Sequence, residues 1–195
     1  YFSFEFEKRG AQVVATKIDS FFDWDFVGGE AERKRRAAEI ADHAAFTERF
    51  ITGAFNFAHA VRKSTVEKRT TTIYGISPET VGGPFDLVFA GSVTSHLRDP
   101  ILGLERLRTV TAPDGLCVVS APFVDIHPDI PAAAMVGTAD TDRRSWWVLN
   151  KLCLIEMLKM AGFTQIDVVS YFTLQLQRPD TQADAFPHIV AHARP

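Results

Sequence analysis

The chain has 195 residues, of which 46% are hydrophobic and 23% are charged, and its formal net charge at pH 7 is −3. These values fit one globular domain with a substantial core, and they give no general argument for binding to nucleic acid or to a membrane surface. The sequence contains no apolar run of about 18 residues that would span a membrane and no visible signal peptide. We therefore expect a cytoplasmic protein without a membrane segment.

The two cysteines, Cys117 and Cys153, stand in apolar surroundings, and neither has neighbours at the spacing of metal ligands. We expect both side chains to be buried, reduced thiols. We expect no metal site.

The beginning of the chain is typical of the middle of a βαβ unit. Tyr1–Arg9 has a short amphipathic helix pattern that would end at Gly10. Gln12–Ile18 follows with a strand pattern and leads to Asp19. Because a βαβ unit has a strand before its helix, we expect a first strand and a glycine-rich turn ahead of Tyr1.

Residues 21–50 have the composition of an insertion or a lid. Aromatic side chains alternate with aspartates up to Gly28-Gly29, and a charged helix pattern follows from Glu30 to about Phe50. The basic run Arg33–Arg36 within it has two interpretations. Most charge runs form a solvated helix face; alternatively, this segment is an exposed flap that covers a ligand or touches an anionic substrate.

The centre of the chain is a strand that stops at a glycine. A helix pattern over Phe55–Val66 and a β-branched strand pattern over Thr70–Ile76 come before it. The apolar run within Phe85–Val93 is typical of a strand buried on both faces; it stops at Gly91, and a helix pattern follows over Ile101–Val110. Ligands of open α/β sheets bind at the carboxyl ends of the strands, so we expect the site at this strand end.

The rest of the chain alternates between strands and helices. The predicted elements are a tight turn at Asp114-Gly115, a strand over Leu116–Ala121, a long loop over residues 122–145, a helix over Trp146–Ala161 ended by Gly162, and strands over Gln165–Leu176 and Phe186–Ala193. The loop is long enough to be functional, and we expect it on the substrate side. The polar segment between the last two strands predicts an antiparallel pair.

Residues Phe85–Pro100 follow the pattern FDxVxxGxxxxHLRDP. Segments over residues 2–15, 74–83, 106–115 and 147–163 accompany it in the right order. With these motifs the chain resembles the class I S-adenosylmethionine-dependent methyltransferases along essentially its whole length. It is similar in particular to bacterial methyltransferases that carry this segment, a group that also resembles the tRNA uridine carboxymethyltransferases.

The resemblance implies an α/β fold with a Rossmann-like three-layer α/β/α methyltransferase sheet, mostly parallel and with an antiparallel last strand. It implies the strand order 3-2-1-4-5-7-6 in a single domain over residues 1–195. The first strand of that order lies between the second and the fourth. Without it, Gln12–Ile18 and Leu87–Val93 would lack a shared partner and would leave backbone groups unpaired, so we expect this strand in the native protein.

The resemblance also implies that S-adenosylmethionine is the cofactor. In the family an acid at the end of the second strand binds the ribose hydroxyls; here Lys17 aligns with that acid. Asp19 points to the same side of an extended strand and would substitute, with Ile18 between them as a further cofactor contact. The other interpretation is an alignment that is wrong by two residues.

Two more strand ends would contact the cofactor. After the third strand the sequence Tyr74-Gly75-Ile76 contains no acid, and Ile76 would pack on the adenine ring. After the fourth strand, Gly91 would let the backbone come close to the cofactor, and Ser92 and Val93 would line it.

His96 lies just past this strand end, where a general base that titrates near neutral pH would act. The alternative is that His96 only caps or packs the turn, because Arg98-Asp99-Pro100 is a typical helix start. The resemblance places the substrate pocket around His127, Trp146, Trp147 and Asn150. The aromatic rings there would stack on a planar substrate or simply close the core.

Three function classes remain open. The first is an active methyltransferase acting on a small molecule or an RNA base, without DNA or membrane partners; the oligomeric state is not predicted. The second is a catalytically degenerate methyltransferase fold that serves as a binding module, which Lys17 and Gly75 favour. The third, a nicotinamide dinucleotide oxidoreductase, is disfavoured by the antiparallel final hairpin.

Overall fold

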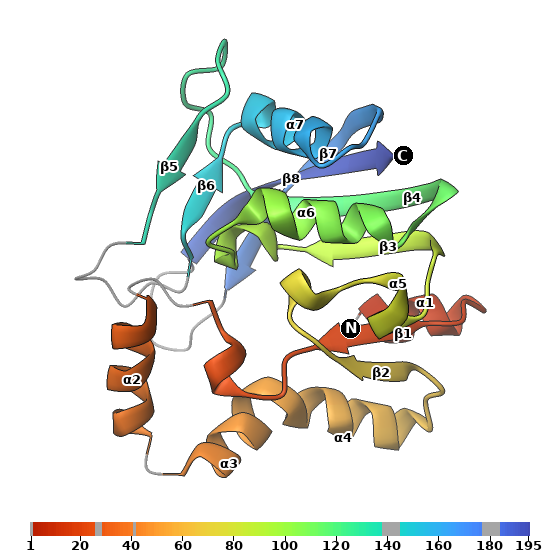
Figure 1. Cartoon of the computed structure of the whole chain (residues 1–195), viewed down its shortest axis with the longest axis vertical. Helices are drawn as coiled ribbons and strands as arrows, with labels where there is room; N and C mark the ends of the chain where they lie inside the picture. Colours follow the sequence, from red (N-terminus) through yellow and green to blue (C-terminus); the bar gives the residue numbers. More distant parts are fainter. Residues whose placement is uncertain (1, 26–28, 41, 138–144, 177–183) are drawn as a thin grey trace. The chain divides into compact units, whose positions relative to one another are not determined.

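The computed structural model describes residues 2–25, 29–40, 42–137, 145–176 and 184–195 (Figure 1). Its internal contacts divide the chain into two compact units, residues 1–82 and residues 83–195. Each unit has its own sheet, and each is described separately below.

The first unit is a parallel two-stranded sheet with helices. Its elements are α1 (Phe2–Lys8), β1 (Val14–Lys17), α2 (Gly29–Glu39), α3 (His43–Thr47), α4 (Gly53–Arg62), β2 (Glu67–Thr70) and α5 (Pro78–Val81), with 3₁₀ turns at Phe21–Asp23 and Ile73–Gly75 and a π-helical segment at Glu48–Thr52. β1 pairs with β2 in register from Val14–Glu67 to Lys17–Thr70. After α1, Gly10 has a φ of +89°, the left-handed stop that the sequence predicts.

The strand predicted over Thr70–Ile76 is wrong, because β2 ends at Thr70 and a 3₁₀ turn follows at Ile73–Gly75. The β-branched run favours a strand, but local hydrogen bonds compete with the ladder. The Thr71 hydroxyl donates to the Thr72 carbonyl, and the Thr80 hydroxyl donates to the Gly75 carbonyl.

One aromatic cluster joins α1 to α4 within the first unit. The Phe4 ring is buried and stacks on Phe55 with ring centroids 5.1 Å apart. The Arg62 guanidinium lies 5.5 Å from the centroid of the Phe4 ring. Beside this cluster, the Glu7 carboxylate accepts hydrogen bonds from the Ser64 hydroxyl and from the Thr65 backbone and hydroxyl, which ties α1 to the start of β2.

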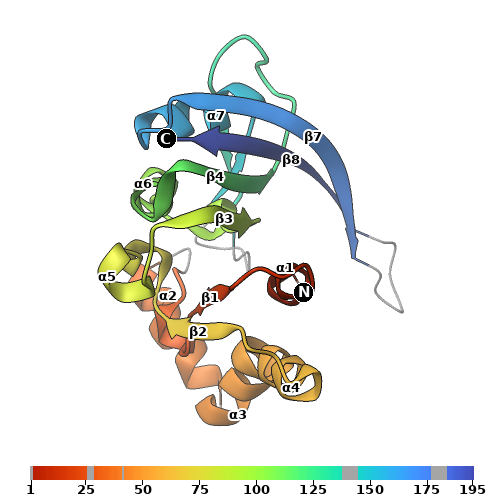
Figure 2. The same ribbon diagram turned by 90° about the vertical axis from the view of Figure 1, so that its right-hand side faces the viewer.

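The second unit is a four-stranded sheet in the order β3-β4-β8-β7 (Figure 2). The strands are β3 (Phe85–Gly91), β4 (Thr111–Pro122), β7 (Gln165–Leu176) and β8 (Asp184–Arg194). β3 pairs with β4 in parallel, and β8 is antiparallel to both β4 and β7. The last strand therefore runs against the other three, as the sequence predicts.

Two helices, α6 (Pro100–Thr109) and α7 (Lys151–Met160), contact each other and cover one face of this sheet (Figure 2). The strand residues on that face alternate along each strand, and all are buried: Val88, Ala90, Cys117, Val119, Ala121, Ile189, Ala191 and Ala193. On the other face, Leu87 is 43% exposed. The prediction that Phe85–Val93 is buried on both faces is therefore wrong, because α6 and α7 cover one side only.

Both cysteines are buried and unpaired, as predicted. Burial raises the pKa of the Cys117 thiol to about 12 and also raises the pKa of Cys153. Both side chains are therefore neutral thiols at physiological pH and pack as small apolar groups.

The helix predicted over Trp146–Ala161 begins later than expected. Trp147–Leu149 forms β6, which pairs antiparallel with β5 (Ala133–Met135), and α7 starts after Asn150. The Asn150 side chain caps α7 by accepting from the Cys153 backbone N–H at 2.8 Å, and an N-cap residue has non-helical backbone angles.

The pairings follow the predicted strand order, with β1 next to β2 and the order β3-β4-β8-β7. Among the described residues, β1 pairs with β2 only and β3 pairs with β4 only. The single domain over residues 1–195, with a further strand between β1 and β3, stays a prediction.

Asn150 is expected to be a main determinant of the stability of the second unit. Its Oδ1 also accepts from the Ala132 N–H, and its Nδ2 donates to the carbonyls of Ile126, His127 and Ile130. Because Asn150→Ala removes the cap and leaves three loop carbonyls without their donor, we expect it to cost about 3 kcal/mol in urea denaturation. Asn150→Ser restores only the cap and should recover about 1 kcal/mol; an alanine variant as stable as wild type would contradict this role.

Candidate functional site

The carboxyl end of β1 carries a paired carboxylate. The Lys17 ammonium forms an ion pair with Asp19 Oδ1, and the Thr70 hydroxyl donates to Asp19 Oδ2 at 2.5 Å. These hydrogen bonds, that of Lys17 foremost, lower the pKa of Asp19, so the group is an anion at neutral pH. The Asp19 side chain is 48% exposed, and each oxygen retains a lone pair for a further donor. Ile18 between them is half-buried.

An acid does reach the turn after β2, although the local sequence contains none. The Tyr74 hydroxyl donates to Asp25 Oδ2 at 2.6 Å. Asp25 lies 49 residues earlier in the chain, so no local spacing signalled this contact. Ile76 next to it is buried, with 6% of its surface exposed, which leaves little of its side chain available to a ligand in this conformation.

The carboxyl end of β3 has an unusual backbone. Ser92 has a φ of +57°, a left-handed conformation that costs a non-glycine residue about 1 kcal/mol or more. Its N–H donates to the Ser120 carbonyl at 2.9 Å. A Cβ at Gly91 would lie 3.0 Å from the Phe89 ring, so this glycine makes room for that ring. Val93 is half-buried and begins the 3₁₀ turn Thr94–His96.

The Ser92 hydroxyl meets a histidine that the sequence did not single out. Its Oγ lies 2.8 Å from Nε2 of His188, which comes from β8. His188 Nδ1 lies 2.8 Å from the Phe186 carbonyl, and the imidazole stacks on Phe172 with centroids 4.9 Å apart. Because a carbonyl only accepts, Nδ1 carries a proton, which leaves Nε2 of the neutral ring to accept from Ser92.

A second polar group at this strand end has no partner. Thr94 is only 1% exposed, and its hydroxyl makes no hydrogen bond with the described residues. Buried polar groups are nearly always satisfied. The Thr94 hydroxyl is therefore an unsatisfied polar group at this strand end.

His96 and the two tryptophans lie together next to this turn. His96 Nδ1 is 3.5 Å from the Ser145 hydroxyl. The Trp146 N–H donates to the Ser95 carbonyl at 2.7 Å, and the Trp147 indole lies 3.4 Å from the Arg98 carbonyl. Asp99 caps α6 through the Leu102 N–H, so the Arg98-Asp99-Pro100 segment is a helix start, as predicted.

The predicted substrate residues Asn150 and His127 lie in the loop before α7. Asn150 is 2% exposed, and its amide holds the loop as described above, whereas His127 is exposed with a φ of +46°. A pocket of about 330 Å³ lies beside Asn150, lined by Phe123, Asp125, Pro128, Asn150, Lys151 and Tyr171. The Phe123 and Tyr171 rings meet edge to face at 5.3 Å.

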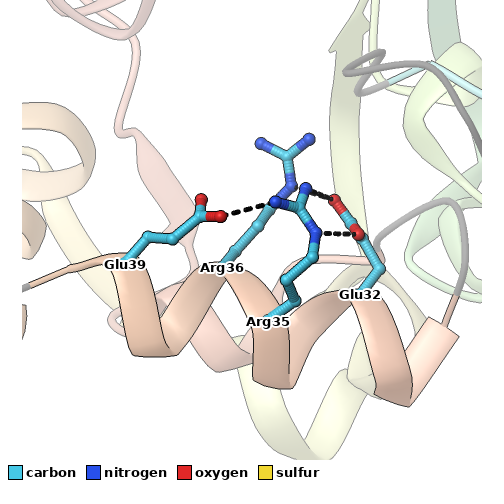
Figure 3. Close-up of polar contacts among 4 residues, drawn as sticks. All are labelled: Glu32, Arg35, Arg36 and Glu39. Atoms are coloured by element: carbon cyan, nitrogen blue, oxygen red, sulfur yellow. Dashed lines mark hydrogen bonds and ion pairs between the residues drawn. The ribbon is translucent and has the colours of Figure 1, made fainter.

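Arg35 and Arg36 of the basic run pair with glutamates of the same helix, α2 (Figure 3). Arg35 donates two hydrogen bonds to Glu32, at 2.8 and 2.7 Å, and one to Glu39 at 2.5 Å. Arg36 donates to the same Glu32 at 2.6 Å. The Arg35 hydrogen bond, reinforced by Arg36, lowers the pKa of Glu32 to about 2. These pairs favour the interpretation of a self-satisfied helix face over that of a flap for an anionic substrate.

No family model and no curated protein matches the sequence, but solved structures match the fold. The N-terminal domain of EvdMO1 with SAH bound aligns with a TM-score of 0.55 at 16% identity, over 99% of this chain and 79% of that chain. CrArsM, an arsenic(III) S-adenosylmethionine methyltransferase from Chlamydomonas reinhardtii, aligns with a TM-score of 0.54 at 17% identity, over 94% of this chain and 55% of that chain.

The chain has the class I methyltransferase fold. PH0226 from Pyrococcus horikoshii is also similar, with a TM-score of 0.50 at 15% identity over 100% of this chain and 76% of that chain. A second structure of the EvdMO1 N-terminal domain also matches, and there this chain spans 66% of the length of the EvdMO1 chain. At these identities the likeness concerns the fold.

Glu32 gives a test of the α2 pairing. Its pKa is depressed in the folded chain, so its contribution to stability is present above its unfolded value near 4.5 and is lost as the pH falls toward 2. We expect Glu32→Gln to be less stable than wild type at pH 7, with a difference that shrinks between pH 4.5 and 2 in urea denaturation. Glu39→Gln is the matched control and should show a smaller effect; a pH-independent difference for Glu32→Gln would contradict the pairing.

Proposed function

We propose that the protein is an S-adenosylmethionine-dependent methyltransferase that acts on a small molecule. The observation that carries this proposal is the carboxyl end of β3. There a left-handed Ser92 contacts a buried histidine, and the hydroxyl of the nearby Thr94 has no partner among the described residues. The chain shares its fold with SAH-bound EvdMO1 and with CrArsM. Such strand ends are the ligand edges of open α/β sheets.

The residues at β3 fit the cofactor as follows. The Gly91 and Ser92 backbone and Val93 would line it, and the Thr94 hydroxyl has an unused hydrogen-bonding capacity. The sulfonium of the cofactor supplies a methyl group that is already activated. The chain's own residues then need to orient the acceptor, exclude water and take up a proton where the acceptor carries one.

Asp19 fits the ribose role in the first unit. Its carboxylate is anionic and half exposed, and two hydroxyls can bond to the lone pairs that Lys17 and Thr70 leave free. Lys17 would then fix the carboxylate rather than bind the ribose itself. Ile18 and Ile76 remain the proposed apolar contacts.

The acceptor side is proposed around His96, His127, Trp146 and Trp147, with Asn150 holding the loop. The self-paired α2 cations give no basic stripe for the phosphates of an RNA, which favours a small-molecule acceptor over an RNA base. In the described part of the chain, no helix combines the length and the apolar character needed to cross a membrane. A cytoplasmic location, with no DNA or membrane partner, remains part of the proposal.

The second candidate function is a binding module that has lost catalysis. The observation that favours it is the Lys17–Asp19 ion pair, because the ammonium competes with ribose hydroxyls for the carboxylate. This function predicts ligand binding, or none, without methyl transfer.

Titration calorimetry of the full-length protein with S-adenosylhomocysteine tests the proposal. We expect binding, and we expect Asp19→Ala to weaken it about tenfold or more, because two hydrogen bonds to a charged group are lost. Glu67→Gln, which changes a carboxylate on β2 that is paired with Arg69, is the control and should bind as wild type. Absence of binding at millimolar concentration would sink the proposal, and binding without any labelled methyl transfer to cell extract would favour the binding module.

A further inference from the structure

The face of the sheet opposite α6 and α7 presents an apolar patch beside the Ser92–His188 pair. In the register of β7 and β8, Phe172 lies opposite His188, and Leu174 lies opposite Phe186. Residues directly opposite each other share a face, and alternate residues along a strand do so too. These side chains therefore form one surface, the β7–β8 patch, defined by Phe172, Leu174, Phe186 and His188.

The apolar members of this patch are unusually exposed. Phe172 is 43%, Leu174 is 42% and Phe186 is 41% exposed, whereas His188 is 2% exposed. Exposed apolar residues that gather in one place mark binding surfaces more often than scattered ones do. The flat Phe172 ring stacked on the imidazole adds a planar surface.

The hydrogen bonds of the pair determine what kind of group it would accept. The Phe186 carbonyl holds the proton on His188 Nδ1, so the Ser92 hydroxyl donates its hydrogen to Nε2. No other described side chain bonds to Ser92 Oγ, so its lone pairs are available only as acceptors. A ligand that completes this site must bring a hydrogen-bond donor.

We expect the hydrogen-bond donor of this ligand to be an uncharged group. An ammonium group placed on an apolar patch would lose its hydration without gaining a counter-charge. A hydroxyl on a planar ring meets both requirements, because its ring covers the phenylalanines and its O–H points to Ser92.

We propose that the β7–β8 patch with Ser92 and His188 is a further part of the acceptor site, beyond the residues named above, and that it takes a hydroxylated aromatic compound, with Ser92 and His188 as the proton acceptors. This rests on the proposed methyltransferase function and names its substrate class. In the transfer, the acceptor O–H bond breaks, an O–CH₃ bond forms, and the S–CH₃ bond of the donor breaks to leave a neutral thioether. The proton passes to Ser92 Oγ while the Ser92 proton moves to His188 Nε2, and the imidazolium later releases a proton to water.

The choice of a hydroxyl acceptor explains why a base is present. A phenolic group has a pKa near 10 and so keeps its proton at neutral pH, and methylation of its oxygen is faster when a positioned base takes that proton. A histidine in the neutral tautomer fixed by a backbone carbonyl supplies such a base.

The test is equilibrium binding of three probes to the full-length protein, followed by NMR of ¹⁵N-labelled histidine side chains. Phenol has both ring and hydroxyl, cyclohexanol has only the hydroxyl, and benzene has only the ring. We expect phenol to bind about tenfold more tightly than either of the others and to shift the His188 Nε2 resonance. Equal binding of phenol and benzene, a shift elsewhere only, or no phenol binding at about 50 mM, well above a millimolar dissociation constant, would overturn the proposal.

Variants separate the hydroxyl from the fold. Ser92→Gly removes the hydroxyl and suits the left-handed backbone, so it avoids the strain that Ser92→Ala retains; it should abolish the preference for phenol over benzene. Ser170→Ala is the matched control, because it removes a serine of β7 that pairs with Val190 rather than with His188, and it should bind phenol as wild type. A Ser92→Gly variant that keeps the phenol preference would overturn the role of Ser92.

The same samples are titrated with S-adenosylhomocysteine. Binding of this cofactor product without any phenol preference overturns the acceptor site alone and leaves the proposed function standing. Phenol binding without cofactor binding would instead overturn the proposed function.

Discussion

The position of β8 between β4 and β7 is the constraint on which the second unit depends. Because β8 runs antiparallel to both neighbours, it carries His188 to the carboxyl end of β3, where it meets Ser92 across 96 residues of sequence. The same pairing puts Ile189, Ala191 and Ala193 under α6 and α7, where all three are fully buried. One register thus fixes both the core on one face and the polar pair at the edge of the other.

Each of the two units holds polar side chains in place at the end of a strand. Asp19 is held by Lys17 and Thr70, and Ser92 is held by His188. Each pair is satisfied internally yet keeps lone pairs for another donor. Internal partners of this kind keep side chains in place and so reduce the ordering that binding would otherwise require.

Local signals predicted much of the fold from the sequence. Gly10 and the Asp99-Pro100 helix start lie where caps and turns require such residues, and apolar runs bounded by turn residues predicted the strands of the second unit. The errors arose where a local preference competed with another bond. The threonines after β2 bond to nearby carbonyls instead of a ladder. The Asn150 cap starts α7 at Lys151, five residues later than the apolar pattern indicates. His188 could not be chosen beforehand, because its role depends on a partner that only the strand order brings near.

The central claim, that the carboxyl end of β3 belongs to a cofactor site, is tested most directly by ultraviolet cross-linking of S-adenosyl-[methyl-³H]methionine to the full-length protein, followed by tryptic mapping. The account predicts label in the peptide Thr70–Arg98, which contains the β3 end, and loss of that label when unlabelled S-adenosylhomocysteine is added. Label that is absent from this peptide, or that unlabelled S-adenosylhomocysteine does not displace, would contradict it.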